Sequence, residues 1–325
     1  MSVEHSRALQ AATAFWDREV VERAHPIWLA HPLVREYVNR QIGGTGGSCW
    51  PLDWFQRHYP QRFPLALSIG CGSGGLERDA LRRGISAQID AFDASPESLA
   101  IARAEAAREG MSDALRYYPD DFERADLPPR KYDLIIFQQS LHHVGRLERL
   151  LRLVRRALKP NGVVYLDEYI GPSRTYWNEQ TFVWYRALFE LLPRPLRYAE
   201  PFGLPVQWED LSEAIRSGEI VSRLKIGFEI ERFQGYGGNL LAIMFPLLAA
   251  GADADDVVKM LVEAEKRLIE GGAPPFHALI VARPRRGMKG MMATMRYLAA
   301  PKLRRLRTDL LKRTGAAAEE QRFRL

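Results

Sequence analysis

The chain is poor in cysteine and has no long apolar stretch. Only two of its 325 residues are cysteines, Cys49 and Cys71, and their spacing fits neither a disulfide framework nor a zinc site. Scarce cysteine is typical of proteins in a reducing compartment, so we expect a cytoplasmic protein. The longest apolar run, residues 240–250, is too short to cross a bilayer, which takes about 20 residues.

The sequence shows neither the pattern of a secretory signal nor an internal repeat. The first residues, MSVEHSRALQ, lack a basic segment followed by an apolar core, so we expect no signal peptide. The composition is ordinary for a globular chain, with 46% hydrophobic and 26% charged residues. Its length allows one large domain or two modest ones.

Acidic residues are scarce at the C-terminal end. From Arg283 onward thirteen basic and three acidic residues give a net charge of +10, so the rest of the chain carries −4. Leu303, Leu306 and Leu310 recur at helical spacing among these basic residues, which predicts a basic amphipathic helix. Such a helix binds an anionic membrane surface or packs on the body of the protein. Nucleic-acid binding is disfavoured because the body is acidic and shows no RNA-binding module.

Predicted strands and helices alternate through the middle of the chain, which indicates an α/β fold with a parallel sheet covered on both faces. The segment 172–225 is rich in aromatic residues and is predicted to be helical. The predicted strands are residues 65–69, 88–92, 115–118, 132–137, 163–167, 228–233 and 278–282.

The segment LSIGCGSGG follows the first predicted strand and fits two glycine motifs. Gly70, Gly72 and Gly75 match the dinucleotide fingerprint G-x-G-x-x-G, whereas Gly70, Gly72 and Gly74 match the G-x-G-x-G loop of S-adenosylmethionine (SAM) methyltransferases. Asp93, at the end of the next strand, suits a ribose diol in either case. The loop alone therefore leaves hydride transfer and methyl transfer open.

Polar residues follow the later strands, at the edge where an open parallel sheet binds its ligands. Asp121 and Phe122 come after the third strand and place an acid and an apolar ring where an adenine would lie. The fourth strand leads into QQSLHH (138–143), and the fifth ends in DEY (167–169). These features favour the methyltransferase interpretation of the loop.

Taken in order, these segments resemble the class I SAM-dependent methyltransferases over roughly residues 65–170, and FHALIVARP fits the family's final antiparallel hairpin. The resemblance implies a Rossmann-like class I methyltransferase fold. Its sheet is mostly parallel and seven-stranded with an antiparallel last strand, helices on both faces and a helical cap insertion. The matching segments are LSIGCGSGG, IDAFDASPESLAIAR, DDF, YDLIIFQQSLHHV and LKPNGVVYLDE.

The resemblance implies SAM as cofactor, with S-adenosylhomocysteine as product. The sequence departs from the family pattern at Ser68, where an acid usually stands two residues before the first glycine. The positions that match the family's cofactor site are Gly70, Cys71, Gly72, Ser73, Gly74, Asp93, Ala94, Ser95, Asp121, Phe122, Gln138, Gln139 and Ser140.

The flanking segments point to a narrower resemblance. HPLVREYVNRQIGG (31–44), SLHHV (140–144), DEYIGPSR (167–174) and LSEAIRSGEI (211–220) look like a bacterial methyltransferase group associated with glycan or lipid-linked saccharide assembly. This resemblance implies a hydroxyl of a saccharide or of a lipid-linked precursor as the small-molecule acceptor.

Three residues near the strand ends are candidate catalytic groups. His143 is the predicted base, and the alternative is that it packs over SAM or caps a helix. Glu168 and Tyr169 are predicted to orient the acceptor hydroxyl, with Glu168 as a second candidate base or else as a partner of Arg174 or Arg216. No His, Asp or Glu cluster has metal-ligand spacing, so the sequence predicts no metal.

The predicted organisation has three parts. Residues 1–60 form an N-terminal helical lid, residues 61–284 the methyltransferase domain with an acceptor-binding insertion at about 172–225, and residues 285–325 the basic tail. Aromatic residues of the insertion either line an apolar or sugar-stacking site or form core, and they are Trp177, Phe182, Trp184, Tyr185 and Phe189. Nothing in the sequence indicates the oligomeric state.

Two other functions remain open at this point. An NAD-dependent oxidoreductase would use the dinucleotide version of the glycine motif. A methyltransferase-like protein without turnover, assembled at the inner face of the membrane through the basic tail, would be the third possibility.

Overall fold

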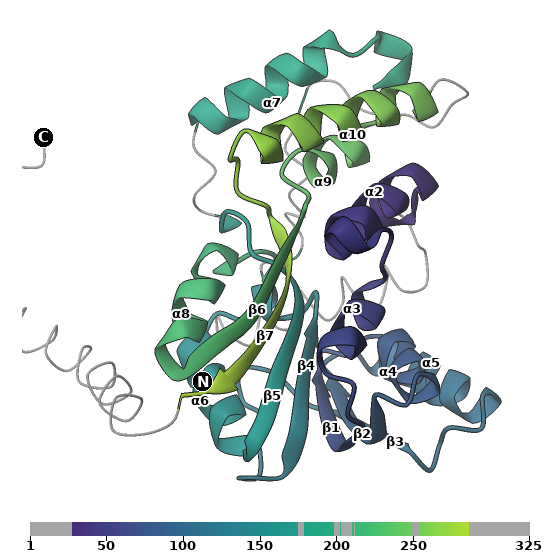
Figure 1. Cartoon of the computed structure of the whole chain (residues 1–325), viewed down its shortest axis with the longest axis vertical. Coiled ribbons are helices and arrows are strands. Elements are labelled where there is room, and N and C mark those ends of the chain that lie inside the picture. Colours follow the sequence, from purple (N-terminus) through teal and green to yellow (C-terminus); the bar gives the residue numbers. More distant parts are fainter. Residues whose placement is uncertain are drawn as a thin grey trace, which may run out of the picture.

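A computed structural model of the chain describes residues 28–174, 179–197, 202, 210, 212–248 and 254–285 (Figure 1). Residues 1–27 of the predicted lid, Trp177 and the basic tail after Arg285 lie outside these residues. Among the described helices, none combines the length and the apolar character needed to cross a membrane.

The centre of the molecule is a seven-stranded sheet in the order β3-β2-β1-β4-β5-β7-β6. β7 runs antiparallel to both of its neighbours, and the other strands are parallel to one another. The strands are β1 (Phe63–Ile69), β2 (Ser86–Asp93), β3 (Leu115–Pro119), β4 (Tyr132–Gln138), β5 (Leu158–Tyr169), β6 (Phe228–Gly237) and β7 (His277–Pro284). This topology confirms the predicted fold class, and every predicted strand is present.

Alternating burial explains how the sheet is held between two helical layers. Successive strand residues point to opposite faces, so Leu134 and Ile136 of β4 belong to one apolar core while Ile135 and Phe137 belong to the other. α3 (Pro51–His58) and α4 (Gly75–Arg82) contribute to the first core. α6 (Leu147–Ala157) and α8 (Ile220–Gly227) contribute to the second.

The local sequence fixes the ends of these helices. Ser95 is the N-cap of α5 (Pro96–Arg108), and its hydroxyl accepts the Ser98 amide N–H at 3.0 Å. Pro96 follows at the first helical position, as the start signal predicts. In α6 the buried residues Leu147, Leu150 and Val154 recur at helical spacing and face the sheet.

A second group of helices lies around the carboxyl end of β6 and the amino end of β7 (Figure 1). It consists of α2 (Pro32–Gly43), α7 (Glu179–Leu191), α9 (Leu241–Met244) and α10 (Ala254–Glu270). Glu265 of α10 joins this group to the sheet. Its buried carboxylate accepts the amide N–H groups of Gly238, Leu240 and Leu241 at 2.8, 2.9 and 2.7 Å. The short 3-10 helices are η1 (Trp28–Ala30), η2 (Gly44–Gly46), η3 (Leu141–His143), η5 (Arg194–Leu196), η6 (Ser217–Glu219) and η7 (Phe245–Leu247).

Register places the polar residues of several strand ends side by side. Ile69 of β1 pairs with Phe92 of β2 and with Phe137 of β4. Gln138 of β4 pairs in turn with Asp167 of β5. The glycine loop, Asp93 and the segment after β4 therefore meet at one edge of the sheet, where ligands bind in open α/β folds.

Candidate functional site

The three glycines of the methyltransferase interpretation share a left-handed backbone conformation. Gly70, Gly72 and Gly74 have φ of +74°, +51° and +73°, in the left-handed region that favours glycine, whereas Gly75 is the first residue of α4 and has no positive φ. A Cβ on Gly70 would lie 2.6 Å from the Ser140 Cβ, so this position is closely packed. A Cβ on Gly72 would meet no atom within 4 Å, so the loop presents an open backbone surface there.

Asp93 ties this loop to the end of β2. Its Oδ2 accepts the Gly72 amide N–H at 2.8 Å and its Oδ1 accepts the Ser95 amide N–H at 2.9 Å. Ala94 is the residue between Asp93 and Ser95 in the sequence. The structure thus places Asp93 and the loop side by side, while the Ser95 hydroxyl is engaged as the cap of α5.

The remaining loop side chains play local roles. Burial raises the pKa of the Cys71 thiol, so Cys71 is a protonated thiol at neutral pH. Ser73 is exposed, and its carbonyl accepts a hydrogen bond from Arg78 at 2.8 Å. The loop therefore offers backbone rather than reactive side chains to a ligand.

A buried carboxyl stands next to Ser68. The Ser68 hydroxyl donates to Oε1 of Glu77 at 2.5 Å, and both residues are buried. Burial raises the pKa of Glu77 to about 7. Its Oε2 has no hydrogen-bond partner among the described residues. Sequence reasoning missed Glu77, although an acid in the first turn after the loop is a visible signal. It supplies from α4 the acidic group that the Ser68 position lacks.

Phe122 and Asp121 lie on the β3 side of the loop. The Phe122 ring is 3.0 Å from the position that a Cβ on Gly70 would occupy and 6.1 Å, between centroids, from Phe92. Asp121 Oδ1 accepts the Glu123 amide N–H at 2.8 Å, which fixes the turn. The predicted apolar ring is thus beside the glycine loop.

The residues after β4 hold the strand ends together. Gln139, with φ +48°, donates its amide N–H to the Asp167 carbonyl at 2.8 Å, and its side-chain Nε2 donates to the same oxygen at 3.2 Å. The Ser140 hydroxyl donates to the Ile69 carbonyl at 2.7 Å. Gln138 is exposed, so of these three predicted cofactor residues it is the one whose side chain faces outward.

Glu168 is an anchor for this turn. Its buried carboxylate accepts the amide N–H groups of Ser140, Leu141 and Tyr169 at 3.0, 2.7 and 2.8 Å. It also accepts the Nδ1–H of His142 at 2.5 Å. Four donors thus occupy the carboxylate, while its role as a base or in orienting the acceptor stays a prediction.

The predicted arginine partners of Glu168 lie elsewhere. Arg216 forms ion pairs with Glu148 and Glu219, at 2.6 and 2.8 Å. Arg174 donates to the Asp210 carbonyl at 2.6 Å. Their positive charges therefore stabilise the segment around residues 210–219 rather than the end of β5.

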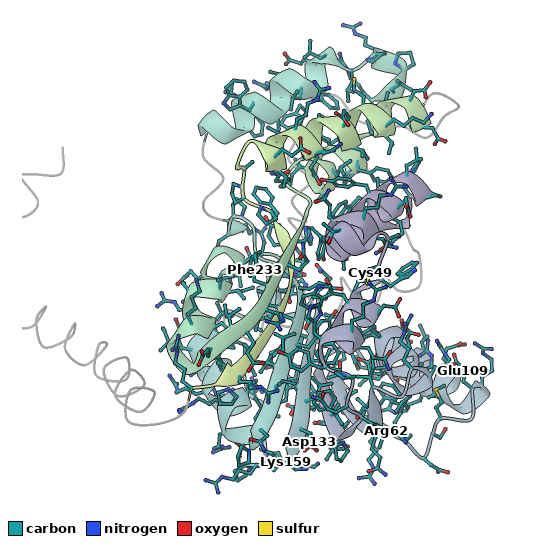
Figure 2. The ribbon with its side chains drawn as sticks, viewed as in Figure 1. Cys49, Arg62, Glu109, Asp133, Lys159 and Phe233 are labelled. Atoms are coloured by element: carbon teal, nitrogen blue, oxygen red, sulfur yellow. The ribbon has the colours of Figure 1, made fainter. Side chains whose placement is uncertain are left out.

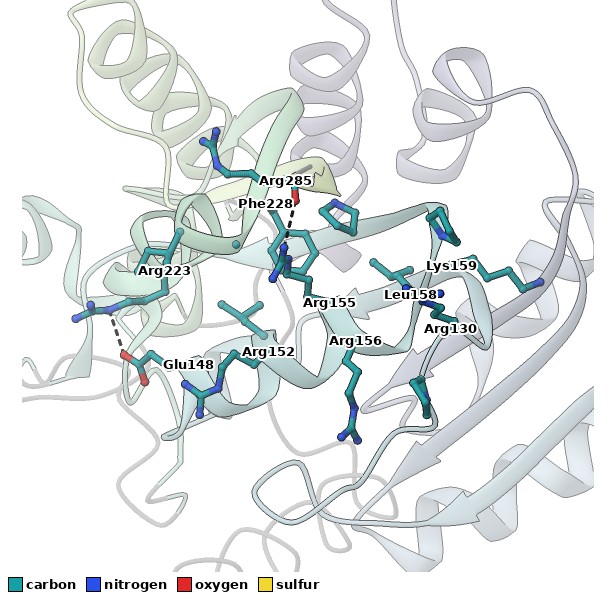
Figure 3. A pocket seen from close by; sticks show the side chains of 16 residues that line it. Arg130, Glu148, Arg152, Arg155, Arg156, Leu158, Lys159, Arg223, Phe228 and Arg285 are labelled. Atoms are coloured by element: carbon teal, nitrogen blue, oxygen red, sulfur yellow. Dashed lines mark hydrogen bonds and ion pairs between the residues drawn. The ribbon is translucent and has the colours of Figure 1, made fainter. Parts of the chain in front are cut away.

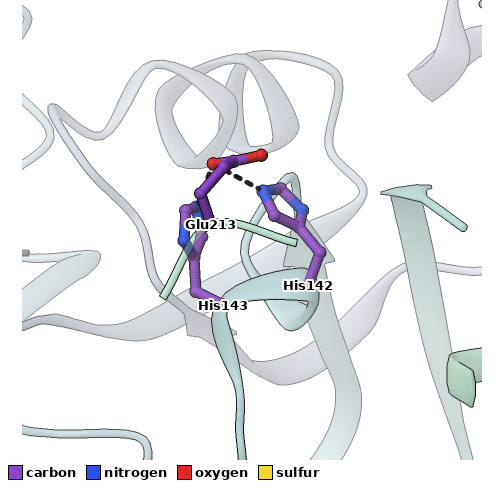
Figure 4. A group of neighbouring side chains, drawn as sticks. All are labelled: His142, His143 and Glu213. Carbon is purple, nitrogen blue, oxygen red and sulfur yellow. Dashed lines mark ion pairs between the residues drawn. The ribbon is translucent and has the colours of Figure 1, made fainter. Parts of the chain in front are cut away.

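Two histidines and Glu213 gather beside this anchor (Figure 4). His142 lies between Glu168 and Glu213; burial lowers its pKa, but these two carboxylates outweigh burial and raise the pKa to about 10. His143 Nδ1 is 3.1 Å from Ser212 Oγ and 3.4 Å from Asp210 Oδ2. Burial and the charge of His142 lower the pKa of His143. The predicted base is therefore an oriented imidazole at the edge of the sheet that carries the glycine loop.

Tyr169 and the aromatic insertion are only partly available for an acceptor. The Tyr169 hydroxyl donates to the Pro172 carbonyl at 3.1 Å, and its ring meets His142 edge-on, with centroids 6.0 Å apart. Phe189 is buried core, whereas Trp184 is 69% exposed. Phe182 packs on Phe202, and Tyr185 donates to the Asn239 carbonyl.

A separate cavity of about 810 Å³ opens at the opposite edge of the sheet (Figure 3). It is bordered by the starts of β5 and β6 and by the end of β7, far from the glycine loop along the strands. Lys159, at this edge, pairs with Asp133 at 2.7 Å (Figure 2). The basic residues that line the cavity are Arg130, Arg152, Arg155, Arg156, Lys159, Arg223 and Arg285.

Comparisons with known proteins agree with this fold. Residues 67–166 match the family model of a methyltransferase domain. The ubiquinone biosynthesis O-methyltransferase of Methylobacterium sp. (strain 4-46) is 26% identical over 226 residues, which is 67% of this chain and 81% of that protein. The acetylserotonin O-methyltransferase of Mus musculus is 35% identical over 125 residues, 35% of this chain and 32% of that protein.

The chain is also similar to solved structures. A S-adenosylmethionine dependent methyltransferase from Mesorhizobium loti has 19% identity, covers 71% of this chain and 97% of its own, and has a TM-score of 0.41. Phosphoethanolamine N-methyltransferase 2 of Haemonchus contortus, solved in complex with S-adenosyl-L-methionine, has 19% identity, coverage of 77% and 57%, and a TM-score of 0.47.

Proposed function

We propose that this chain, which carries a class I SAM-dependent methyltransferase domain, transfers the methyl group of SAM to a hydroxyl of a small-molecule acceptor. The observation that carries the proposal is the edge of the sheet where the open glycine loop after β1 packs against Ser140, in the turn after β4 that leads to an oriented His143. The named relatives support oxygen as the accepting atom, since both are O-methyltransferases.

The residues of the loop fit the cofactor. Gly72 leaves space for close approach, Asp93 lies beside it at the end of β2, and Phe122 supplies an apolar ring. Glu77 Oε2, buried and without a partner among the described residues, suits the cofactor's amino group. SAM, when bound, supplies a methyl group on a positively charged sulfur.

The chain's own task is then to align the acceptor. The donor is already activated, so positioning of the nucleophilic oxygen dominates catalysis. We assign contact with the acceptor hydroxyl to His143, whose ring is oriented by Ser212 and Asp210. Glu168 keeps the turn that carries His143 in place, through the amides of Ser140 and Leu141.

An acceptor with a saccharide or a lipid-linked part extends this proposal. The flanking segments of the sequence support it by their resemblance. Exposed Trp184, Leu188 and Leu191 also support it, because they recur at helical spacing on α7 and present an apolar stripe to solvent.

A cytoplasmic protein at the inner face of a membrane is the matching location. The Arg- and Lys-lined cavity supports it, because Arg285 belongs to that cavity and the basic tail continues from there. Each basic residue near an anionic surface contributes about 1 kcal/mol.

Transfer of labelled methyl groups from SAM to a panel of phenols, free sugars and lipid-linked saccharides tests the function. We expect product with at least one hydroxyl acceptor and none with the matching O-methylated compounds. A folded, SAM-binding chain that labels nothing in the panel would instead support a binding protein without turnover.

A further inference from the structure

The cluster around His142, His143 and Glu213 has the composition of a metal centre. One ligand atom from each residue can be chosen so that all three lie within 4.8 Å of one another (Figure 4). Glu213 Oε2 is 3.7 Å from His142 Nε2 and 3.8 Å from His143 Nε2. Both imidazoles therefore point their Nε2 atoms toward the Glu213 carboxylate.

The other ring nitrogen of each histidine faces a buried carboxylate. His142 Nδ1 is 2.5 Å from Glu168 Oε1, and His143 Nδ1 is 3.4 Å from Asp210 Oδ2. Metal-binding histidines commonly donate this second N–H to a carboxylate, which fixes the tautomer and the ring orientation. Here His142 Nδ1 has such a partner in Glu168, whereas His143 Nδ1 is bonded to the Ser212 hydroxyl at 3.1 Å, which in turn donates to Asp210. In both rings the Nε2 atom faces Glu213.

The two supporting carboxylates are themselves held rigidly. Glu168 accepts three backbone amides. Asp210 Oδ1 accepts the Ser212 amide N–H at 2.8 Å and the Ser212 hydroxyl at 2.6 Å. Glu213 differs from them, because its side chain is 24% exposed. Buried hydrogen bonds therefore fix the two supporting carboxylates, and solvent contacts the cluster through Glu213.

We propose that His142 Nε2, His143 Nε2 and the Glu213 carboxylate bind a divalent transition-metal ion such as Zn²⁺. Two imidazoles and one carboxylate form the ligand set of catalytic zinc sites, which keep a further position open. Imidazole ligands favour zinc over magnesium. No metal was predicted from the sequence, because Glu213 lies far from the two histidines along the chain.

The open position suits the oxygen of the acceptor. η3, which carries both histidines, directly follows β4 at the edge of the glycine loop, and Ser140 is bonded to the end of β1. With an ion bound, the contact between His143 and the acceptor hydroxyl runs through that ion. This role rests on the proposed function, whereas metal binding itself does not.

Calorimetric titration of Zn²⁺ into the untagged, chelator-treated full chain tests the site. We expect one ion per chain and no comparable binding of Mg²⁺. Glu213→Gln and His142→Gln remove proposed ligands and should weaken Zn²⁺ binding by at least the roughly 10- to 100-fold that is typical when a partner of a ligand is lost. His31→Gln is the matched control, because His31 also contacts a carboxylate, Asp255 at 3.2 Å, outside the cluster; it should bind Zn²⁺ as the wild type does.

Far-ultraviolet circular dichroism reports whether each variant is folded. If His142→Gln fails to fold, the partly exposed Glu213→Gln carries the test. A folded wild type that takes up no Zn²⁺, or a folded Glu213→Gln variant that binds it unchanged, would overturn the site. Zinc binding without methyl transfer would contradict the proposed function and leave the metal site standing; methyl transfer unaffected by chelation and without zinc binding would do the reverse.

Discussion

Glu77 places a carboxyl next to Ser68, the position at which the glycine motif lacks its usual acid. Its carboxyl comes from α4 and meets the Ser68 hydroxyl beneath the glycine loop. A buried acid next to this loop favours a positively charged ligand group. The loop therefore has a carboxyl group beside it although its sequence motif lacks one.

Glu77→Gln should lower SAM affinity about tenfold, because a hydrogen bond to a charged group contributes about 1.5 kcal/mol or more. Glu97→Gln is the control, since Glu97 also lies in the first turn of a helix but is exposed. Calorimetry with SAM compares the two. Equal affinities for both variants would remove Glu77 from the cofactor site.

The same carboxyl predicts a pH effect on stability. Burial raises the pKa of Glu77 to about 7 from its ordinary value of 4.5. The folded chain then holds this proton more tightly than the unfolded chain, so the stabilisation present below the lower value is lost as the pH rises through the higher one. As the pH rises from about 5 to about 8, the wild type should therefore lose stability relative to Glu77→Gln, which has no carboxyl group to deprotonate. Urea unfolding at both pH values measures this difference, and a difference that does not change with pH would contradict it.

At the scale of elements, the strands were predictable because buried strands of a parallel sheet are apolar almost throughout. Two details were not. β5 begins at Leu158 rather than 163, since the ladder with β4 shifts register between Tyr132 and Leu134 and thereby includes the K-P-N-G segment. Residue partners were also hidden, because they come from tertiary contacts: Glu168 was recognised as a site residue, but the four donors that occupy it were not.

Glu168→Gln tests whether this turn is anchored or catalytic. Removing a buried, hydrogen-bonded charge should cost about 3 kcal/mol of unfolding free energy. Glu148→Gln, which breaks the partly exposed pair with Arg216, should cost about 1 kcal/mol or less. Urea denaturation measures both. If Glu168→Gln kept its stability and its cofactor affinity but lost turnover, the original assignment as a base would hold.

At the scale of the whole molecule, the two edges of the sheet differ in character. The carboxyl ends of β1, β2 and β4 carry the glycine loop and the histidines, whereas the opposite edge carries the basic cavity (Figures 1 and 3). Composition alone located the excess positive charge in the C-terminal tail. It did not reveal the cavity, because its arginines come from separated segments that only the fold brings together.

The proposed membrane attachment through that edge has a direct consequence. Arg130→Glu combined with Arg152→Glu should weaken sedimentation with phosphatidylglycerol vesicles about tenfold or more, since each basic residue contributes about 1 kcal/mol. Lys266→Glu with Arg267→Glu makes the same charge change on exposed α10 and should have little effect. Equal binding by both double variants would exclude the cavity as the contact surface.

Binding of S-adenosylhomocysteine to the full chain, measured by calorimetry, tests the central claim most directly. The account predicts saturable binding at one site per chain, abolished by Gly72→Val, whose side chain would enter the open face of the loop. Gly84→Val should bind normally, although Gly84 has a similar positive φ, +70°, and equal space around it, so that backbone strain is matched. A folded wild type that binds no S-adenosylhomocysteine, or a folded Gly72→Val variant that binds it as tightly, would contradict the account.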